Sequence, residues 1–159
     1  MKTREELLNS PSTLIDEMDI NFFYEDISFR LNQSENTKKW IAAIVEAEDY
    51  LITELNYIFC SDTYLHKINL DFLNHDTYTD IITFDNRETE KREIQGEIYI
   101  SVDRVKENAG IYKKPFEQEL HRVIIHGVLH LLGYQDKSEA EKKEMRKKEE
   151  ACLSLQNLN

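Results

Sequence analysis

The segment from Pro115 to Gly133 constrains the fold more than any other part of the chain. Proline suits the first turn of a helix, because its ring presets φ and its missing N–H has no helical partner there. Glycine suits the position just past a helix end, where it takes the left-handed conformation that reverses the chain. Apolar residues recur between them at helical spacing. We therefore expect one long helix over residues 116–132 that packs into the core.

The rest of the chain alternates strand-like and helix-like segments. Runs of β-branched and aromatic residues predict strands at 20–29, at 55–62, at 82–84 and from Gly96 onward. Apolar residues at helical spacing predict helices over 37–52, from Asp62 to Phe72 and over 102–109. Gly110 is expected to end the last of these helices. Ser138 and Glu141 match a capping box that opens a final, charged helix.

The resulting order, β-α-β-α-β-β-α-α-α, indicates an α+β protein. We expect a single domain in which one mixed four-stranded sheet packs with about five helices, mainly on one face. This domain is expected to span residues 18–159, and residues 1–17 to form an N-terminal tail or extension. At 159 residues the chain has the length of one domain and can bury a core without disulfides.

Charge and composition limit the classes of function. The net charge of −11 argues against broad, non-specific binding to nucleic acids, although lysine and arginine outnumber acidic residues between 113 and 148. Cys60 and Cys152 lie far apart and predict a reducing compartment rather than a disulfide framework. No apolar stretch approaches the roughly 20 residues that span a bilayer, and the N-terminus is too polar for a secretory signal. We expect a cytoplasmic protein without membrane or DNA partners.

His126 and His130 lie four residues apart in the predicted long helix, so their side chains differ by about 40° around its axis. Past the reversal at Gly133, Asp136 is placed to fold back towards them. Two imidazoles and one carboxylate leave an open coordination position, as in catalytic rather than structural zinc sites. The same spacing also suits two core histidines followed by an ordinary turn, and spacing alone leaves both interpretations open.

Position 127 is glycine, whereas zinc peptidases of the His-Glu-x-x-His type carry their general base there. A peptidase is therefore disfavoured. Glycine in a helix costs about 1 kcal/mol of helix propensity relative to alanine. Gly127 thus indicates either the close approach of a ligand or another helix or strand that crosses at this position.

The stretch HGVLHLLGYQD at 126–136 resembles the His-Gly-x-Leu-His-Leu-x-Gly-Tyr-Asp-His signature of the YbeY family. INLDFLNHDTYTDIITF at 68–84 resembles the family's Leu-Asn-x-x-Tyr-Arg … Thr-Asp-Val-Leu-Ser-Phe block, and GEIYIS at 96–101 resembles its Gly-Asp-Ile-x-Ile-Ser strand. The three blocks keep the family's order and spacing. The resemblance implies a bacterial metal-dependent endoribonuclease that cleaves single-stranded RNA in ribosomal RNA maturation and ribosome quality control.

The resemblance also implies a set of metal ligands, which fall on His126, His130 and Asp136. Asp136 stands where the family usually has histidine, and it keeps a competent ligand type. Zinc is the expected ion. Two histidines and a carboxylate also suit iron. Iron, nickel and manganese therefore stay open as alternative ions. The site is expected at the C-terminal end of the long helix.

A second departure concerns a cation. Leu73 stands where the family has an arginine that contacts RNA or supports catalysis. Arg122 lies four residues before His126 on the same helical stripe, and we consider it a candidate phosphate clamp that replaces this arginine. The alternative is a solvated arginine, or one paired with Glu119 or Asp103.

The remaining expectations concern substrate and partners. Lys137 and Lys142 are candidate RNA contacts, although they equally suit a solvated helix face. Thr79 and Asp80 are expected to fix the loop before the strand at 82–84 rather than to perform chemistry. The implied substrate is a ribosomal RNA precursor, with a ribosomal protein or ribosome-associated GTPase as further partners. The alternative function is a ribosome-associated binding factor with a mainly structural metal, which Leu73 and the acidic charge favour.

Overall fold

The computed structural model describes residues 19–88 and 91–158, so the predicted tail at 1–17 lies outside the described residues. The described elements are β1 (Ile20–Glu25), α3 (Ser34–Ala47), β2 (Leu51–Cys60), α4 (Asp62–Leu73), β3 (Ile81–Asp85), β4 (Glu93–Ser101), α5 (Val102–Tyr112), α6 (Phe116–Leu131), α7 (Glu139–Ser154) and a 3₁₀ turn at Leu155–Leu158. This order confirms the predicted one. Among these elements, no helix has both the length and the apolar character needed to cross a membrane.

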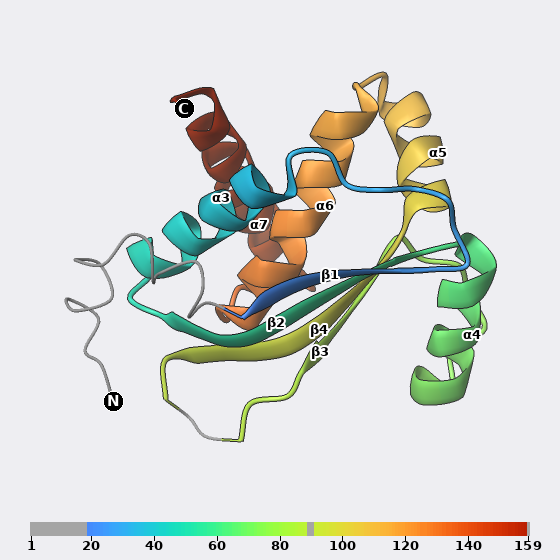
Figure 1. The fold of residues 1–159 in the computed structure, drawn as a ribbon, viewed down its shortest axis with the longest axis horizontal. Coiled ribbons are helices and arrows are strands. Elements are labelled where there is room, and N and C mark those ends of the chain that lie inside the picture. The colour runs from blue at the N-terminus through green and yellow to red at the C-terminus, as the bar shows by residue number, and fades with distance from the viewer. Residues whose placement is uncertain (1–18, 89–90, 159) are drawn as a thin grey trace.

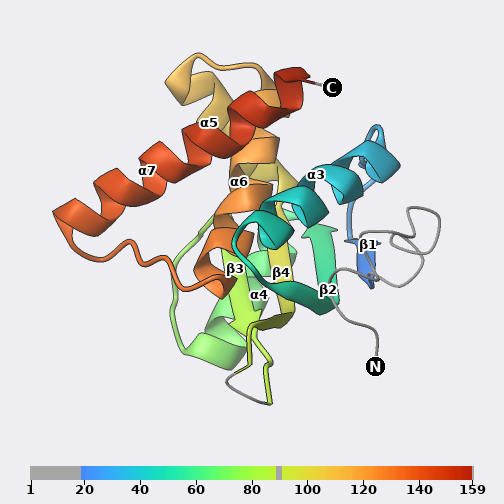
Figure 2. The ribbon, with the colours of Figure 1, turned by 90° about the vertical axis from the view of Figure 1, so that its left-hand side faces the viewer.

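The four strands form one mixed sheet in the order β1-β2-β4-β3. β1, β2 and β4 run parallel, whereas β3 pairs antiparallel with β4. As a result, β1 and β3 are the edge strands. α3 and α6 cover one face of the sheet, with α7 packed on α6, and α4 covers the other face (Figure 1 and Figure 2). The predicted single α+β domain, with helices mainly on one face, is confirmed.

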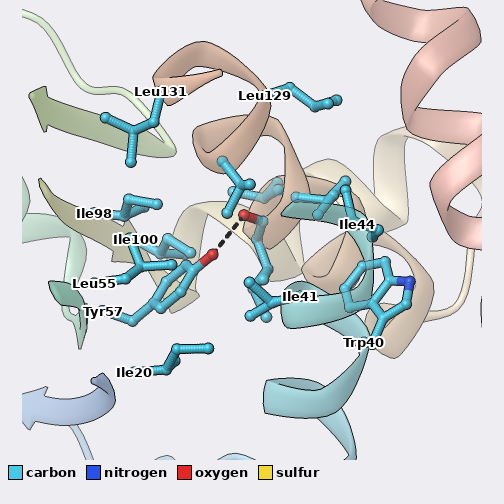
Figure 3. Close-up of a cluster of buried hydrophobic side chains, with 14 of the residues drawn as sticks. Ile20, Trp40, Ile41, Ile44, Leu55, Tyr57, Ile98, Ile100, Leu129 and Leu131 are labelled. Carbon is cyan, nitrogen blue, oxygen red and sulfur yellow. Dashed lines mark hydrogen bonds between the residues drawn. The ribbon is translucent and has the colours of Figure 1, made fainter. Parts of the chain in front are cut away.

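The core forms between α6 and the sheet. Tyr57 of β2 is fully buried there, and its hydroxyl donates a hydrogen bond of 3.0 Å to the Ile124 carbonyl (Figure 3). On the outer side, the Trp40 indole of α3 donates 2.9 Å to the Cys152 carbonyl of α7. Buried polar groups need such partners, because leaving them unpaired costs about 1–3 kcal/mol. The two bonds anchor α6 to the sheet and join the helices that flank it.

At Gly127, α6 packs tightly against side chains of the sheet. A β-carbon there would lie 2.8 Å from Cδ1 of Ile98 on β4 and 3.2 Å from Cδ1 of Ile81 on β3. The interpretation that a strand crosses at Gly127 is therefore confirmed. The missing side chain brings the two strands close to the helix that carries His126 and His130.

Several predicted boundaries are wrong. The strand predicted at 20–29 ends at Glu25, and the strand predicted at 55–62 runs from Leu51 to Cys60. The helix predicted over 37–52 ends at Ala47, because Asp49 takes a positive φ of 62° and turns the chain so that Leu51 begins β2. Gly110 does not end α5. That helix continues to Tyr112, and Lys113 takes the left-handed position, with φ 55°. At both helix ends a non-glycine residue, Asp49 or Lys113, adopts the left-handed conformation, which is uncommon outside glycine.

Candidate metal centre

His126, His130 and Asp136 come together at the C-terminal end of α6. The Nε2 atoms of the two histidines lie 3.0 Å apart, and Oδ2 of Asp136 lies 3.3 Å from that of His126 and 3.2 Å from that of His130. A tetrahedral zinc ion, with ligands at about 2.0–2.1 Å, separates its ligand atoms by roughly 3.3 Å. These three donors therefore fit one small divalent ion. Within residues 19–88 and 91–158, no other three His, Cys, Asp or Glu side chains group this closely.

The turn after α6 brings Asp136 back to the histidines. Gly133 takes a φ of 106°, and its N–H donates 3.0 Å to the His130 carbonyl. The N–H of Tyr134 donates 3.0 Å to the carbonyl of Leu129. These two bonds form a Schellman motif, in which the left-handed residue satisfies the last carbonyls of the helix. The predicted chain reversal at Gly133 is confirmed, and it places Asp136 against His130.

A carboxylate contacts the other ring nitrogen of His126. Glu149 of α7 lies against Nδ1 of His126, and its second oxygen accepts 3.1 Å from Nη1 of Arg122. Arg122 also donates 2.9 Å and 2.6 Å to the two oxygens of Glu119. Hydrogen bonds and charge from Glu119 and Glu149 raise the pKa of Arg122 above its ordinary value. An arginine thus lies between two buried carboxylates directly behind the histidine.

A family model described as Endoribonuclease YbeY matches residues 19–157. The chain belongs to the YbeY family. The Endoribonuclease YbeY of Cytophaga hutchinsonii is 55% identical over 136 residues, which cover 86% of this chain and 94% of that protein. That of Christiangramia forsetii is 50% identical over 137 residues, with the same coverage. A Thermotoga maritima protein solved in solution shares 32% identity and a TM-score of 0.58, over 83% of this chain and 86% of that one.

The candidate ligands of this YbeY protein open onto a cleft of about 460 Å³. Its lining consists of the three ligands and of Thr79, Asp80, Ile81, Thr83, Asp85 and Leu131. Alternate residues of β3 face the cleft because successive side chains of a strand point to opposite sides. The edge strand β3 thus forms one wall of the cleft, and the end of α6, with the ligands, forms the other.

Asp80 lies in this wall, which the sequence did not reveal. Burial raises the pKa of its carboxyl group above the ordinary value, and the charges of Arg122 and His126 partly offset this shift. Thr79 fixes the loop as expected, since its hydroxyl donates 3.4 Å to the Ile81 carbonyl, and the Asp80 carboxyl also forms a hydrogen bond with its own backbone. A carboxyl group with a raised pKa beside candidate metal ligands is typical of a functional position.

We predict that Asp80→Asn stabilises the metal-free protein increasingly as the pH rises. A raised pKa in the folded state means that the folded protein binds the proton more tightly than the unfolded chain does. The stability contributed by Asp80 is therefore present below its unfolded pKa and lost as the pH rises through its folded pKa. Denaturant unfolding in chelator, from acid to neutral pH, should show that the free energy of unfolding of the variant rises relative to that of the wild type as the pH rises. A constant difference between the two would contradict the assignment.

Arg122 and Leu73 occupy different parts of the structure. Arg122 forms ion pairs with two carboxylates, those of Glu119 and Glu149. The pair with Glu119 is one of the alternatives that the sequence left open. The role of Arg122 as a phosphate clamp stays a prediction. Leu73 is exposed at the end of α4, on the opposite face of the sheet. His121 packs against Trp40, with ring centroids 5.7 Å apart.

The two candidate RNA-binding lysines lie beyond the ligands. Lys137 directly follows Asp136 and is exposed. Lys142 is exposed on the first turn of α7 and pairs with Glu139 over 3.7 Å. The capping box predicted for this helix is confirmed, because Ser138 and Glu141 bond reciprocally. Both lysines therefore sit on the segment that leads out of the candidate metal centre.

Proposed function

We infer that this chain is a metal-dependent endoribonuclease that cleaves single-stranded RNA in ribosomal RNA maturation and ribosome quality control. The observation that carries this inference is the cluster of His126, His130 and Asp136 beside an open cleft, in a member of a family whose relatives are named endoribonucleases. The ligand set leaves a coordination position free, as hydrolysis requires. A purely structural site would more commonly be closed by four protein ligands.

Zinc is the metal that we propose, held by Nε2 of both histidines and by the Asp136 carboxylate. The donor atoms lie 3.0–3.3 Å apart, close to the separation expected around a tetrahedral zinc ion. When bound, a divalent ion supplies Lewis acidity to a phosphate and lowers the pKa of water to about 7. Iron, nickel and manganese accept the same donors, so metal analysis of the natively purified protein identifies the ion.

The RNA is proposed to enter along β3 and to leave past Lys137 and Lys142. The cleft itself carries the carboxylates of Asp80 and Asp85, so the positive charge needed to hold phosphates lies outside it. Neutralising both lysines should reduce the salt dependence of RNA binding. Each phosphate contact contributes to the slope of the logarithm of the binding constant against the logarithm of the salt concentration. We further propose that a ribosomal protein or ribosome-associated GTPase contacts the acidic remainder of the surface, in the cytoplasm.

The test is cleavage of a single-stranded ribosomal RNA precursor by the purified protein. We expect about one ion per chain, loss of cleavage in chelator and recovery when zinc is restored. The same sequence annealed into a duplex is the control and should resist cleavage. Cleavage that persists in chelator would overturn the metal mechanism. Full metal occupancy without cleavage would instead favour the ribosome-associated binding factor.

A further inference from the structure

We propose that Glu149 and Arg122 are positioning residues that hold His126 ready to bind the metal, so that α7 is part of the metal centre. This proposal rests on the metal site of the proposed function. The carboxylate of Glu149 contacts Nδ1 of His126, whereas Nε2 of the same ring faces His130 and Asp136. One ring thus joins the candidate ligands on one side to Glu149 of α7 on the other, and α7 packs against α6 (Figure 2).

Glu149 determines the tautomer of His126. An ionised carboxylate can only accept hydrogen bonds, so Nδ1 must carry the hydrogen. In the neutral ring Nε2 then holds the lone pair, and this is the atom that faces the other two candidate ligands. Carboxylate partners of this kind fix the orientation of metal-binding histidines and raise their basicity. Without Glu149, both tautomers and several ring angles become available.

Glu149 is itself held in place by Arg122. Its Oε1 accepts from Arg122 and its Oε2 contacts His126, so each oxygen has one partner. Glu119 binds the far side of the Arg122 guanidinium through both oxygens. Glu119 and Glu149 are each only 3% exposed. One cation between two carboxylates leaves a net negative charge behind His126, which favours a cation on its other side.

Glu149 lies on the buried face of α7. The buried residues of this helix are Met145, Glu149 and Cys152, which share one face at spacings of four and three. Glu149 therefore takes the central position of an otherwise apolar face. A buried ion pair contributes little net stability compared with apolar residues of the same volume. A position that costs stability but directs a ligand is the pattern expected of a functional residue.

The experiment compares metal affinity in Glu149→Gln and Glu150→Gln, measured by competition with a chromophoric chelator. The two variants lose the same charge at neighbouring positions, but Glu150 is exposed. We expect Glu149→Gln to bind zinc about 10–100-fold more weakly than the wild type, as loss of an outer partner does, and Glu150→Gln to be unchanged. Equal affinity in both variants would overturn the positioning role. A wild type that binds no metal would overturn this proposal together with the proposed function.

Arg122→Ala separates positioning from phosphate clamping. If Arg122 acts through Glu149, its loss weakens zinc binding and leaves KM for RNA little changed, and Arg122→Lys restores part of the affinity. A raised KM with unchanged zinc affinity would overturn its positioning role and assign it to the substrate phosphate.

A measurement on the metal-free wild type covers the case in which a variant fails to fold. Nitrogen NMR of ¹⁵N-histidine, well above the ordinary histidine pKa of about 6.5, distinguishes the two ring tautomers. We expect His126 to carry its hydrogen on Nδ1. A ring protonated on Nε2 instead would contradict the role of Glu149, whatever the variants do.

Discussion

His130→Ala is expected to abolish stoichiometric metal binding and to lower RNA cleavage by more than about 100-fold, the upper end of what loss of an outer partner costs. The variant keeps only His126 and Asp136 as protein donors, and two donors do not hold a catalytic zinc ion. The imidazole of His130 is partly exposed and bonds only within the ligand cluster among the described contacts, so the fold should tolerate its removal. Metal content and cleavage rate are measured on the same preparation.

His75→Ala is the matched control for this experiment. It makes the same chemical change at an exposed position in the loop between α4 and β3. Metal content and cleavage should stay at wild-type levels in the control. A fully loaded, active His130→Ala protein would show that the histidine pair is structural and would remove the main support for the proposed function.

Gly96→Ala is expected to lower the free energy of unfolding by about 1–3 kcal/mol, the usual cost of overpacking. A β-carbon at this position would lie 2.6 Å from the carbonyl oxygen of Phe84 and 3.1 Å from both δ-carbons of Leu131. The carbonyl belongs to the backbone of β3, so it can move only if the strand moves. Because β3 walls the cleft, we also expect weaker RNA cleavage in this variant.

Gly110→Ala provides the opposite control for Gly96→Ala. Gly110 lies within α5, and a β-carbon there meets nothing within 4 Å. Alanine should therefore stabilise the helix by up to about 1 kcal/mol. Denaturant unfolding of both variants measures the contrast. If both substitutions change the free energy of unfolding equally, the close approach between β3 and β4 is not what excludes a larger side chain at position 96.

The candidate ligands could be predicted because the information that places them is local. His126 and His130 share a helix, and Gly133 reverses the chain within three residues of the second histidine. Resemblance to a family then favoured the metal interpretation over core histidines. Such short-range geometry depends on helix periodicity and on one turn. Neither requires knowledge of how distant elements pack.

Glu149 and Asp80 could not be assigned in this way, because each reaches the site through long-range packing. Glu149 lies in a helix rich in lysine and glutamate, and this composition predicts a solvent-exposed helix. The one available signal is the spacing of Met145, Glu149 and Cys152, which marks a buried stripe. Asp80 enters the cleft only because β3 pairs antiparallel with β4 and lies against α6. The sequence predicts this strand but not its neighbours.

Because α7 follows the three ligand residues in the chain, its position has a consequence for synthesis of the protein. A protein is synthesised from its N-terminus towards its C-terminus, so His126, His130 and Asp136 are all made before Glu149. A nascent or prematurely terminated chain that stops before α7 thus contains all three ligand residues but lacks the carboxylate that orients the first of them. For an enzyme that cuts RNA, the proposed positioning role means that the metal centre is fully formed only after α7 has been made.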